Sequence, residues 1–207
     1  MKIYLVRHGE SEGNKKNVFQ NPDILLSPEG IKQAKILAKR LVDLPMDFVY
    51  SSNMARAKQT SEIISKVINK KIELWEDIRE LIRPSVLWGK KVDGAEGKKF
   101  RKLMEENYKN PDWKFQDEES YNELRLRAKK VLKHLLAKHR NQNVLLVSHG
   151  TMIKMLISTM IFGDNLSPET FWFIRNKLWS KNSGITVCEY TDKYGWGVLA
   201  WNDTAHL

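Results

Sequence analysis

Two segments of the sequence place a histidine and a glycine directly after a short apolar run. Arg-His-Gly at 7–9 follows the run 3–6 (IYLV), and Ser-His-Gly at 148–150 follows the run 144–147 (VLLV). A neutral imidazole is a good nucleophile near pH 7, a guanidinium suits an oxyanion, and glycine lets backbone approach a ligand. These residue types, at the edge of a core, indicate a site that binds an anion and acts on it.

The two apolar runs have the length and composition of buried strands in a parallel sheet. In open α/β sheets the ligand crevice lies outside the carboxyl ends of the strands. Two such strands can bring the imidazoles of His8 and His149 face to face, with Arg7 beside them. A single histidine of this kind is also compatible with an ordinary capped loop, so the hypothesis depends on the pair.

The segment 7–14 (RHGESEGN) resembles the signature of the histidine phosphatase superfamily, also called the phosphoglycerate mutase-like family. Three more segments resemble motifs of that family in the same order: 51–60 (SSNMARAKQT), 79–81 (REL) and 148–150 (SHG). The segment 26–34 (LSPEGIKQA) resembles the start of its first helix. The resemblance extends along most of the chain and favours the phosphatase branch.

The resemblance implies an α/β fold with three layers, α/β/α, around a mostly parallel central sheet, with an insertion after the third strand that caps the site. The sequence pattern places helices and strands in agreement with this. We expect strands at 3–6, 48–50, 72–75, 144–147, 185–190 and 198–201, helices at 28–43, 56–68, 97–109, 119–140, 152–162 and from 168 on, and loop at 14–25. The last two strands form a hairpin through a turn at 194–195.

Residues 83–118 are the expected insertion within a single domain that spans 1–207. Family members commonly follow the acid motif with a Gly-x-Trp-Glu-Gly-like run, whereas this chain has IRPS at 82–85 and WGKK at 88–91. Aromatic residues and lysines between Trp88 and Phe115 predict a pocket for an anionic or flat leaving group. The substrate itself is not identified by the sequence.

The resemblance also implies a role for each matching residue. His8 would attack phosphorus and become a phosphohistidine, and Glu80 would act as acid and then as base. Arg7, Arg56, His149 and the neutral Asn14 would bind the phosphate, with His149 charged when phosphate is present. We expect no metal and no other cofactor, because the arginines and histidine supply positive charge and no metal-ligand spacing is present. A glycine-rich nucleotide loop is also missing, which argues against a kinase or an ATPase.

The composition is that of a globular chain of 207 residues with 42% hydrophobic residues. It contains a single cysteine, Cys188, so an internal disulfide is excluded. No apolar run approaches the roughly 18–20 residues that span a bilayer, and the first strand begins too early for a signal peptide. We therefore expect a cytoplasmic protein that does not bind membranes; its oligomeric state is not predicted.

The chain carries 35 Lys and Arg against 25 Asp and Glu, a net charge of +10. Much of the excess lies in the helix expected at 119–140, on Arg125, Arg127, Lys129, Lys130, Lys133 and Lys138. It is either a solvated face or a means of steering a polyanionic substrate. His134 and His139 lie five apart on the same helix, which is no ligand spacing, and we expect both at the surface.

The leading hypothesis is a metal-independent phosphomonoesterase that hydrolyses a small phosphorylated metabolite through a phosphohistidine on His8. One alternative is a mutase of the phosphoglycerate mutase type, which returns the phosphoryl group to its substrate. Another is a basic module that binds the phosphates of nucleic acid or of a phosphoprotein without turnover. The retention of His8, Glu80 and His149 argues against that module, since binding alone needs neither a nucleophile nor an acid.

Overall fold

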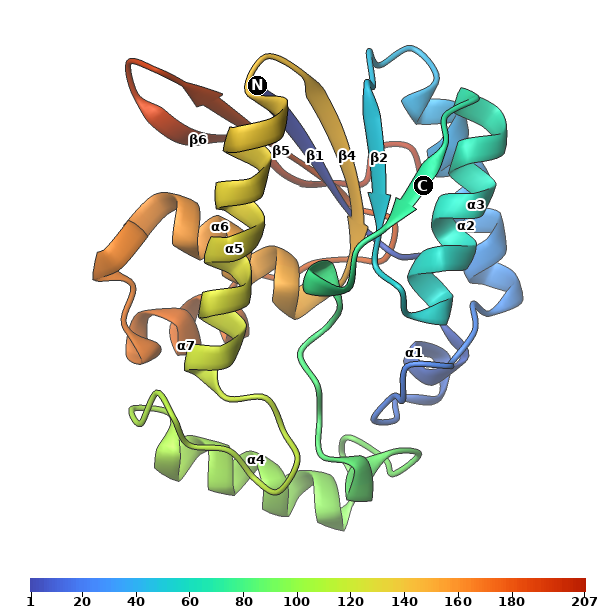
Figure 1. Cartoon of the computed structure of the whole chain (residues 1–207). Coiled ribbons are helices and arrows are strands. Elements are labelled where there is room, and N and C mark those ends of the chain that lie inside the picture. Colours follow the sequence, from blue (N-terminus) through green and yellow to red (C-terminus); the bar gives the residue numbers. More distant parts are fainter.

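A six-stranded sheet lies between two layers of helices in the computed structural model, which describes residues 1–207 (Figure 1). Its strands are β1 (Lys2–Arg7), β2 (Phe48–Ser51), β3 (Ile72–Leu74), β4 (Asn143–Ser148), β5 (Ile185–Thr191) and β6 (Gly195–Asp203). They are arranged in the order β3-β2-β4-β1-β5-β6. The first four strands run parallel, β5 pairs antiparallel with β1, and β6 pairs antiparallel with β5. The expected mostly parallel sheet is confirmed.

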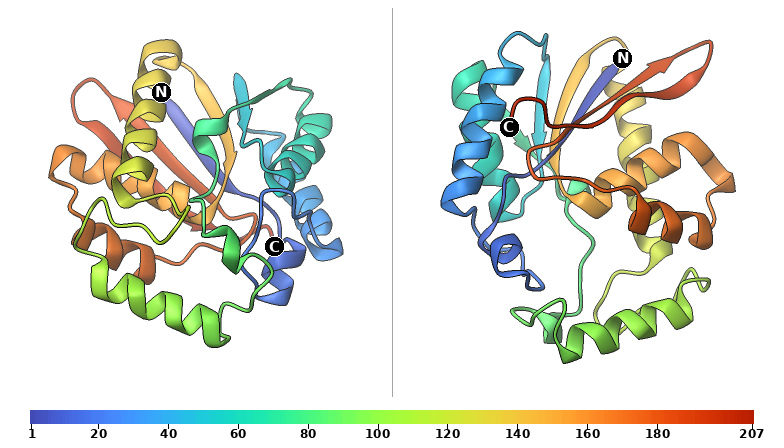
Figure 2. Two further views of the ribbon diagram at one scale, coloured as in Figure 1. Left: turned by 60° about the horizontal axis from the view of Figure 1, so that its bottom comes forward. Right: turned by 180° about the vertical axis from the view of Figure 1, so that it is seen from behind.

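Helices cover both faces of this sheet (Figure 1). The helices are α1 (Glu12–Lys16), α2 (Pro28–Leu41), α3 (Ala55–Ile68), α4 (Ala95–Asn107), α5 (Tyr121–His139), α6 (Gly150–Phe162) and α7 (Pro168–Lys177). Short 3-10 turns lie at Glu76–Ile78, Ser85–Leu87 and Gly163–Asn165. Helices α2 and α3 lie on one face, and α5 and α6 on the other, as Figure 2 shows from two further directions.

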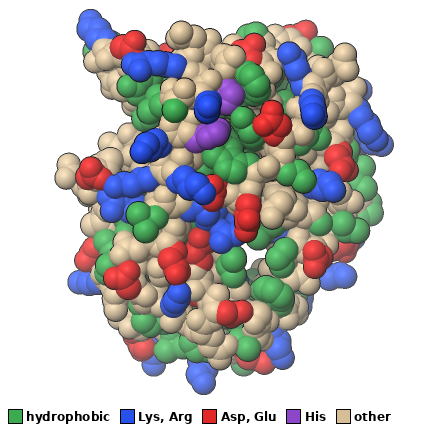
Figure 3. All heavy atoms as spheres, in the orientation of Figure 1, with side chains coloured by type: hydrophobic (Ala, Val, Ile, Leu, Met, Phe, Trp, Pro, Cys, Tyr) green, Lys and Arg blue, Asp and Glu red, His purple; other side chains and the backbone are tan.

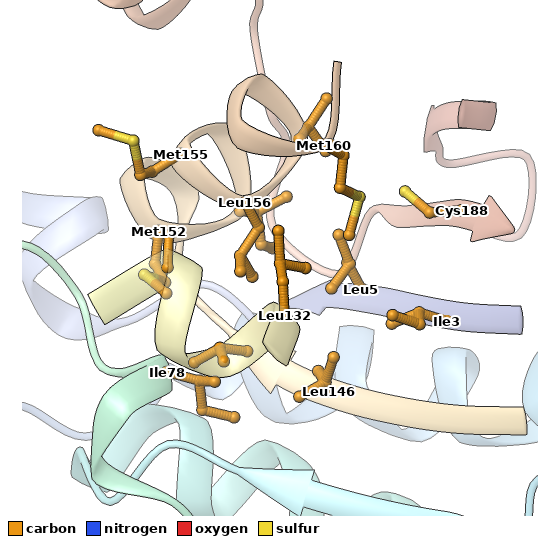
Figure 4. Packing of buried hydrophobic residues seen from close by; sticks show 14 of the residues in the cluster. Ile3, Leu5, Ile78, Leu132, Leu146, Met152, Met155, Leu156, Met160 and Cys188 are labelled. Carbon is orange, nitrogen blue, oxygen red and sulfur yellow. The ribbon is translucent and has the colours of Figure 1, made fainter. Parts of the chain in front are cut away.

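The central strands are buried on both faces because their side chains alternate between two apolar clusters. Ile3 and Leu5 of β1 pack with α5 and α6, whereas Tyr4 and Val6 pack with α2 and α3. On the first face, Met152, Leu156 and Met160 of α6 pack over β1 and β4 (Figure 4). A sheet that buries both faces requires three layers.

The register of β1 and β4 positions the functional residues. These strands pair in parallel with Arg7 opposite Ser148, so the residues that follow each of them leave the sheet side by side at its carboxyl edge. The segment that contains α4 crosses the molecule beyond this edge (Figures 1 and 2). It belongs to the expected insertion, which leaves the body of the protein after β3 and returns at the start of α5.

Several expectations need correction. Residues 14–25 were expected to be loop, but α1 begins at Glu12 because Ser11 caps it and Asn14 completes a capping box. The hairpin strand β6 starts at Gly195, three residues earlier than expected.

The expected surface position of His139 is wrong. Its side chain is buried. Nδ1 donates a hydrogen bond to Gln142 Oε1 (2.7 Å), and Nε2 lies 2.9 Å from Tyr50 Oη. His134 is half-buried against Trp75. The two histidines do lie close together, with ring centroids 6.1 Å apart. Spacing along the helix missed this because both rings lie against Tyr50 of β2.

No helix of the chain combines the length and apolar character needed to cross a bilayer.

Candidate active site

A cavity of about 250 Å³ opens at the carboxyl edge of the sheet, and five of the six predicted site residues line it. These are Arg7, His8, Asn14, Arg56 and Glu80. The sixth, His149, is fully buried directly behind His8, with the two ring centroids 5.0 Å apart at an interplanar angle of 58°. Residues from four distant parts of the sequence therefore meet at one place.

His8 is held in one tautomer. Its Nδ1 lies 2.7 Å from the carbonyl oxygen of Gly9, so Nδ1 carries the proton and donates it. Nε2 is then an acceptor, and Arg56 Nε donates to it at 3.2 Å. The unprotonated nitrogen, which is the nucleophilic one, thus points toward the guanidinium that would meet an incoming anion.

Two guanidinium groups lie at this cavity without a carboxylate within ion-pair distance. Arg56, in the first turn of α3, is buried and donates to the carbonyl of Asn21 and to Met54 Sδ. Arg7 donates to the carbonyl of Ser180, and its Nε is buried without a partner. Burial lowers the pKa of Arg56 to about 10 and lowers that of Arg7, so both remain charged near pH 7. Their charge is available to an anion.

The surroundings of the two imidazoles keep them neutral. Burial, with the charges of Arg56 and Arg7, holds the pKa of His8 well below its ordinary value. Burial and the Arg56 charge do the same to His149. His149 Nε2 lies 2.9 Å from Ser52 Oγ, whereas its Nδ1 is buried without a partner. Unpaired buried polar atoms are uncommon in folded proteins, and two occur here, on Arg7 and His149.

Glu80 is fixed by the start of α6. Its two carboxylate oxygens accept hydrogen bonds from the backbone N–H groups of Thr151 (3.1 Å), Met152 (3.2 Å) and Leu81 (2.9 Å). The helix that begins after His149 therefore positions the candidate acid as well. Glu80 is near enough to Arg7 and Arg56 to raise the pKa of both guanidinium groups against the effect of burial.

Asn14 Oδ1 accepts from the backbone N–H of Ser11 (3.2 Å) and from Asn182 Nδ2 (3.3 Å). Its Nδ2 donor is the part left to a ligand in the cavity. Asn182 also donates to the carbonyl of His8 at 2.9 Å. The loop before β5 thereby supports His8 and Asn14 together, a contribution that the sequence analysis did not identify.

Gly9 has a different role from the one expected. A Cβ on Gly9 would lie 2.5 Å from the carbonyl oxygen of Gly30, so glycine permits the backbone of α2, rather than a ligand, to approach. The N–H of Gly9 donates to Thr60 Oγ1 at 3.1 Å, and the Thr60 hydroxyl donates to the carbonyl of Arg56. Thr60 of α3 thus connects the loop that carries His8 to the first turn of α3, which carries Arg56.

A buried ion pair supports the loop of Glu80. Arg127 and Glu119 form two parallel hydrogen bonds of 2.8 and 2.7 Å, and both side chains are less than a tenth exposed. Arg127 Nη1 also donates to the carbonyls of Asp77 and Arg79. The sequence analysis assigned Arg127 to a basic helix face; it is instead buried behind the site. Only a helical plot that marked Arg127 on the apolar stripe of α5 could have indicated this.

The arrangement can bind a tetrahedral oxyanion between two guanidinium groups, with an imidazole nitrogen in reach of its central atom and a carboxyl group at the cavity wall. No group of three or more His, Cys, Asp or Glu side chains in the chain could hold a metal ion.

Comparison with known proteins assigns the fold and site to a family. The sequence matches the Histidine phosphatase superfamily (branch 1) over residues 3–204. It is 30% identical over 214 residues to the "Probable phosphoglycerate mutase GpmB" of Erwinia tasmaniensis, a match that covers 100% of this chain and 95% of that protein. It is 29% identical to a "Probable phosphatase" of Schizosaccharomyces pombe, with the same shares covered.

Among solved structures, the chain is similar to the phosphoserine phosphatase of Entamoeba histolytica. A histidine-to-alanine mutant of that enzyme in complex with phosphoserine gives a TM-score of 0.82 at 26% identity, covering 100% of this chain and 98% of that one. The same enzyme in complex with 3-phosphoglyceric acid gives a TM-score of 0.80. The chain belongs to the histidine phosphatase superfamily, branch 1, and is an enzyme with the phosphoglycerate mutase-like fold.

Proposed function

We propose that the chain is a phosphomonoesterase that needs no metal and hydrolyses a small phosphorylated metabolite through a phosphohistidine on His8. The observation that carries this proposal is the neutral imidazole of His8, with its bare Nε2 turned toward Arg56 and Arg7. A buried nucleophile between two uncompensated guanidinium groups is suited to attack on an anionic phosphorus centre.

In the first step His8 Nε2 forms a bond to phosphorus, and the bond from phosphorus to the ester oxygen breaks. Glu80 gives its proton to the departing alkoxide, so that an alcohol leaves. Arg7, Arg56 and the Nδ2 of Asn14 bind the equatorial oxygens. The developing charge on these oxygens is matched by the two guanidinium groups, which the cavity holds in place before substrate arrives.

In the second step water attacks the phosphohistidine. Glu80, now a carboxylate, takes a proton from that water, the P–N bond breaks, and inorganic phosphate leaves His8 neutral again. His149 becomes protonated while the phosphate dianion is bound, since the anion reverses the effect of Arg56 and Arg7 on it. Its unpartnered Nδ1 is the atom that remains to respond to the anion.

A mutase that returns the phosphoryl group to substrate is the second candidate, because a relative named as a phosphoglycerate mutase matches along 100% of this chain. Chain length does not separate the two reactions, since the match covers 95% of that relative as well. Strong stimulation by a bisphosphorylated cofactor would indicate a mutase.

The test is hydrolysis of 4-nitrophenyl phosphate with EDTA present, by wild type, His8→Ala and His134→Ala. The last variant removes a histidine that packs against Trp75, outside the site, and serves as the matched control. We expect turnover in wild type and the control and its loss in His8→Ala. Quenching with alkaline detergent during turnover should trap phosphate on the wild-type chain that is stable to alkali and released by acid, and none on His8→Ala.

A rate abolished by EDTA would indicate a metal hydrolase and contradict the mechanism. Absence of turnover without cofactor, but isomerisation of a phosphorylated acid in its presence, would indicate the mutase. The third hypothesis, a binding module, requires nucleic-acid affinity that falls steeply with salt. No binding at low salt would eliminate it.

A further inference from the structure

A second cavity, of about 590 Å³, adjoins the site cavity. The two share Phe19, Arg83 and Val92 in their walls, so a ligand that fills one can extend into the other. The second cavity lies between the insertion and α7. Figure 3 shows the surface hollowed between the sheet-bearing body and the segment with α4, with hydrophobic side chains beside the hollow and both basic and acidic side chains above it.

Three guanidinium groups line this second cavity, those of Arg83, Arg101 and Arg175, against the single carboxylate of Glu105. The sequence analysis expected lysines in this role. The lysines of the insertion instead point to solvent: Lys90 pairs with Glu96 and Lys102 with Glu106, all of them well exposed.

Arg175 is partly buried, and no carboxylate lies within ion-pair distance of it, whereas Arg101, which also has no such partner, is exposed. The guanidinium of Arg175 lies 5.7 Å from the ring centroid of Trp172, and its Nη2 lies 3.9 Å from Met104 Sδ. Burial and the charge of Arg83 lower its pKa to about 9, which leaves it charged near pH 7. A partly buried charge beside an aromatic ring and a sulfur atom, without a carboxylate in ion-pair distance, is stabilised by an anion.

Arg83 lies on the other side of the same sulfur atom, with Nη1 3.4 Å from Met104 Sδ. It forms a 2.5 Å ion pair with the buried Glu118, which fixes its direction and offsets its charge. Lys154 adds a third positive charge behind the pair, since its Nζ donates to the carbonyl of Arg175 at 2.8 Å. Glu118 pairs with Arg83, and Glu80 acts on Arg175 and Lys154 only through space, so none of the three cations except Arg83 has an ion-pair partner.

We propose that Arg175 and Arg83 form a second anion subsite, which selects phosphomonoesters whose leaving group ends in another oxyanion, a carboxylate or a phosphate. This inference rests on the proposed function, because the first phosphate occupies the cavity of His8. Arg83 lines both cavities and so marks the path of the leaving group. The volume beyond Arg83 admits leaving groups larger than a three-carbon acid.

The test uses three matched series of alkyl phosphates with two to eight carbons, ending in a hydroxyl, a carboxylate or a second phosphate. Hydrolysis by wild type, Arg175→Gln and Arg175→Lys is measured, with Arg140→Gln as the control. Arg140 is an exposed arginine that pairs with Asp192. Unfolding temperatures establish that each variant is folded. Arg83→Gln, which changes the other arginine of the subsite, replaces Arg175→Gln if the latter does not fold.

In wild type we expect kcat/KM for a charged end to exceed that for the hydroxyl end by about ten- to hundredfold at one chain length, as charge-assisted hydrogen bonds provide. That ratio should fall at least fivefold in Arg175→Gln and be retained in Arg175→Lys and in the control. The better of the two charged series identifies the oxyanion. The optimal chain length measures the separation of the two subsites.

Equal kcat/KM for charged and neutral ends in wild type would overturn the second subsite and leave the proposed phosphatase intact. An unchanged ratio in folded Arg175→Gln would overturn the role of Arg175 and would leave the proposed phosphatase intact. Binding to His8→Ala, measured by calorimetry, separates the two proposals. Tighter binding of bisphosphates than of monophosphates without any turnover in wild type would support the subsite and refute the phosphatase.

Discussion

Burial among cations determines the chemistry of His8 and His149. An imidazole that is enclosed and faces guanidinium groups loses much of its affinity for protons, and both rings here have pKa values well below the ordinary value. The same surroundings that repel a proton attract phosphate. Nucleophilicity at neutral pH and affinity for an anion thus have one physical origin.

This origin predicts a dependence of stability on pH. Because the folded state holds the pKa of His8 and His149 below the unfolded value of about 6.5, the unfolded chain binds more protons as pH falls below that value. Stability is therefore fully present above pH 6.5 and is lost as pH decreases, by about 1.4 kcal/mol per pH unit for each such histidine. Urea unfolding at pH 7.5 and 5.5 measures the loss.

The control is the double variant His8→Asn/His149→Asn. It should lose the larger part of this pH dependence. The two remaining histidines with lowered pKa, His134 and His206, are less buried than His8 and His149 and contribute less. A pH dependence as large as that of wild type would show that other groups cause it.

The ion pair of Glu119 and Arg127 gives a second prediction at this scale. Glu119→Gln leaves Arg127 buried without its counter-ion and should cost about 3–5 kcal/mol of stability. The double variant Glu119→Leu/Arg127→Met removes both charges and should recover most of that loss. Its kcat should remain at least tenfold below wild type, because no guanidinium then holds the carbonyls of Asp77 and Arg79.

Unfolding free energies and 4-nitrophenyl phosphate kinetics of the three proteins check this prediction. Recovery of kcat together with stability would show that the pair only stabilises the fold. A kcat that stays low in a stable double variant would show that it positions the loop of Glu80.

At the scale of elements, the close contact of α2 with the segment after β1 is sterically demanding. A Cβ on Gly30 would lie 1.8 Å from the carbonyl oxygen of Glu10, which is backbone and cannot turn away. Gly30→Ala should therefore cost about 1–3 kcal/mol or more and lower activity, because Glu10 follows directly after His8 and Gly9. Gly197→Ala is the control, because open space surrounds the added atom, and it should leave both stability and activity unchanged. Thermal unfolding and turnover of both variants test this.

The strands and helices that carry apolar periodicity could be predicted from sequence, because burial on one or both faces leaves a pattern in the chain. The central strands β1 and β4 show this. The His-Gly that follows each of them indicated that the two strands deliver their histidines to the same edge of the sheet, and the two strands do pair in parallel. The short α1 could not be predicted in the same way, since its stability comes from a capping box at Ser11 rather than from an apolar stripe. The start of β6 at Gly195 depends on pairing with β5, which is a tertiary effect.

The position of His8 after a strand and the family resemblance of the segments that carry Arg56 and Glu80 indicated these three residues, and the structure places them around one cavity. The supporting residues were not indicated by the sequence, because Asn182, Thr60 and Glu119 act through atoms that only the folded chain brings near. Arg175 is of the same kind. It lies on a helix near the end of the sequence, and nothing in its neighbours indicates that α7 faces the insertion.

For the whole molecule, the net charge of +10 has two possible uses, and the structure distinguishes between them. Most of the basic residues singled out on α5 have acidic partners on other elements: Arg125 and Lys129 pair with Asp164, and Lys130 pairs with Asp77. Figure 3 shows Lys and Arg interspersed with Asp and Glu on the face it presents. This is a solvated, paired surface rather than a continuous strip for a nucleic-acid backbone.

Three buried or half-buried guanidinium groups without an ion-pair partner, those of Arg7, Arg56 and Arg175, lie instead at the two adjoining cavities. We therefore predict that salt acts on catalysis but that duplex DNA does not bind. Raising ionic strength from 0.05 to 0.5 M should lower kcat/KM for a bisphosphate by several-fold more than for a neutral-ended monophosphate. The reason is that salt screens the attraction that steers a charged substrate to the cavities and holds it there. Fluorescence anisotropy with a labelled 20-base-pair duplex at 0.15 M salt should show no binding up to ten micromolar protein, although non-specific binders of DNA reach Kd values of about 10⁻⁴–10⁻⁶ M. Micromolar affinity for the duplex together with a salt-independent kcat/KM would mean that the positive charge serves a polymer on the outer surface, and the concentration of free guanidinium groups at the cavities would then need another explanation.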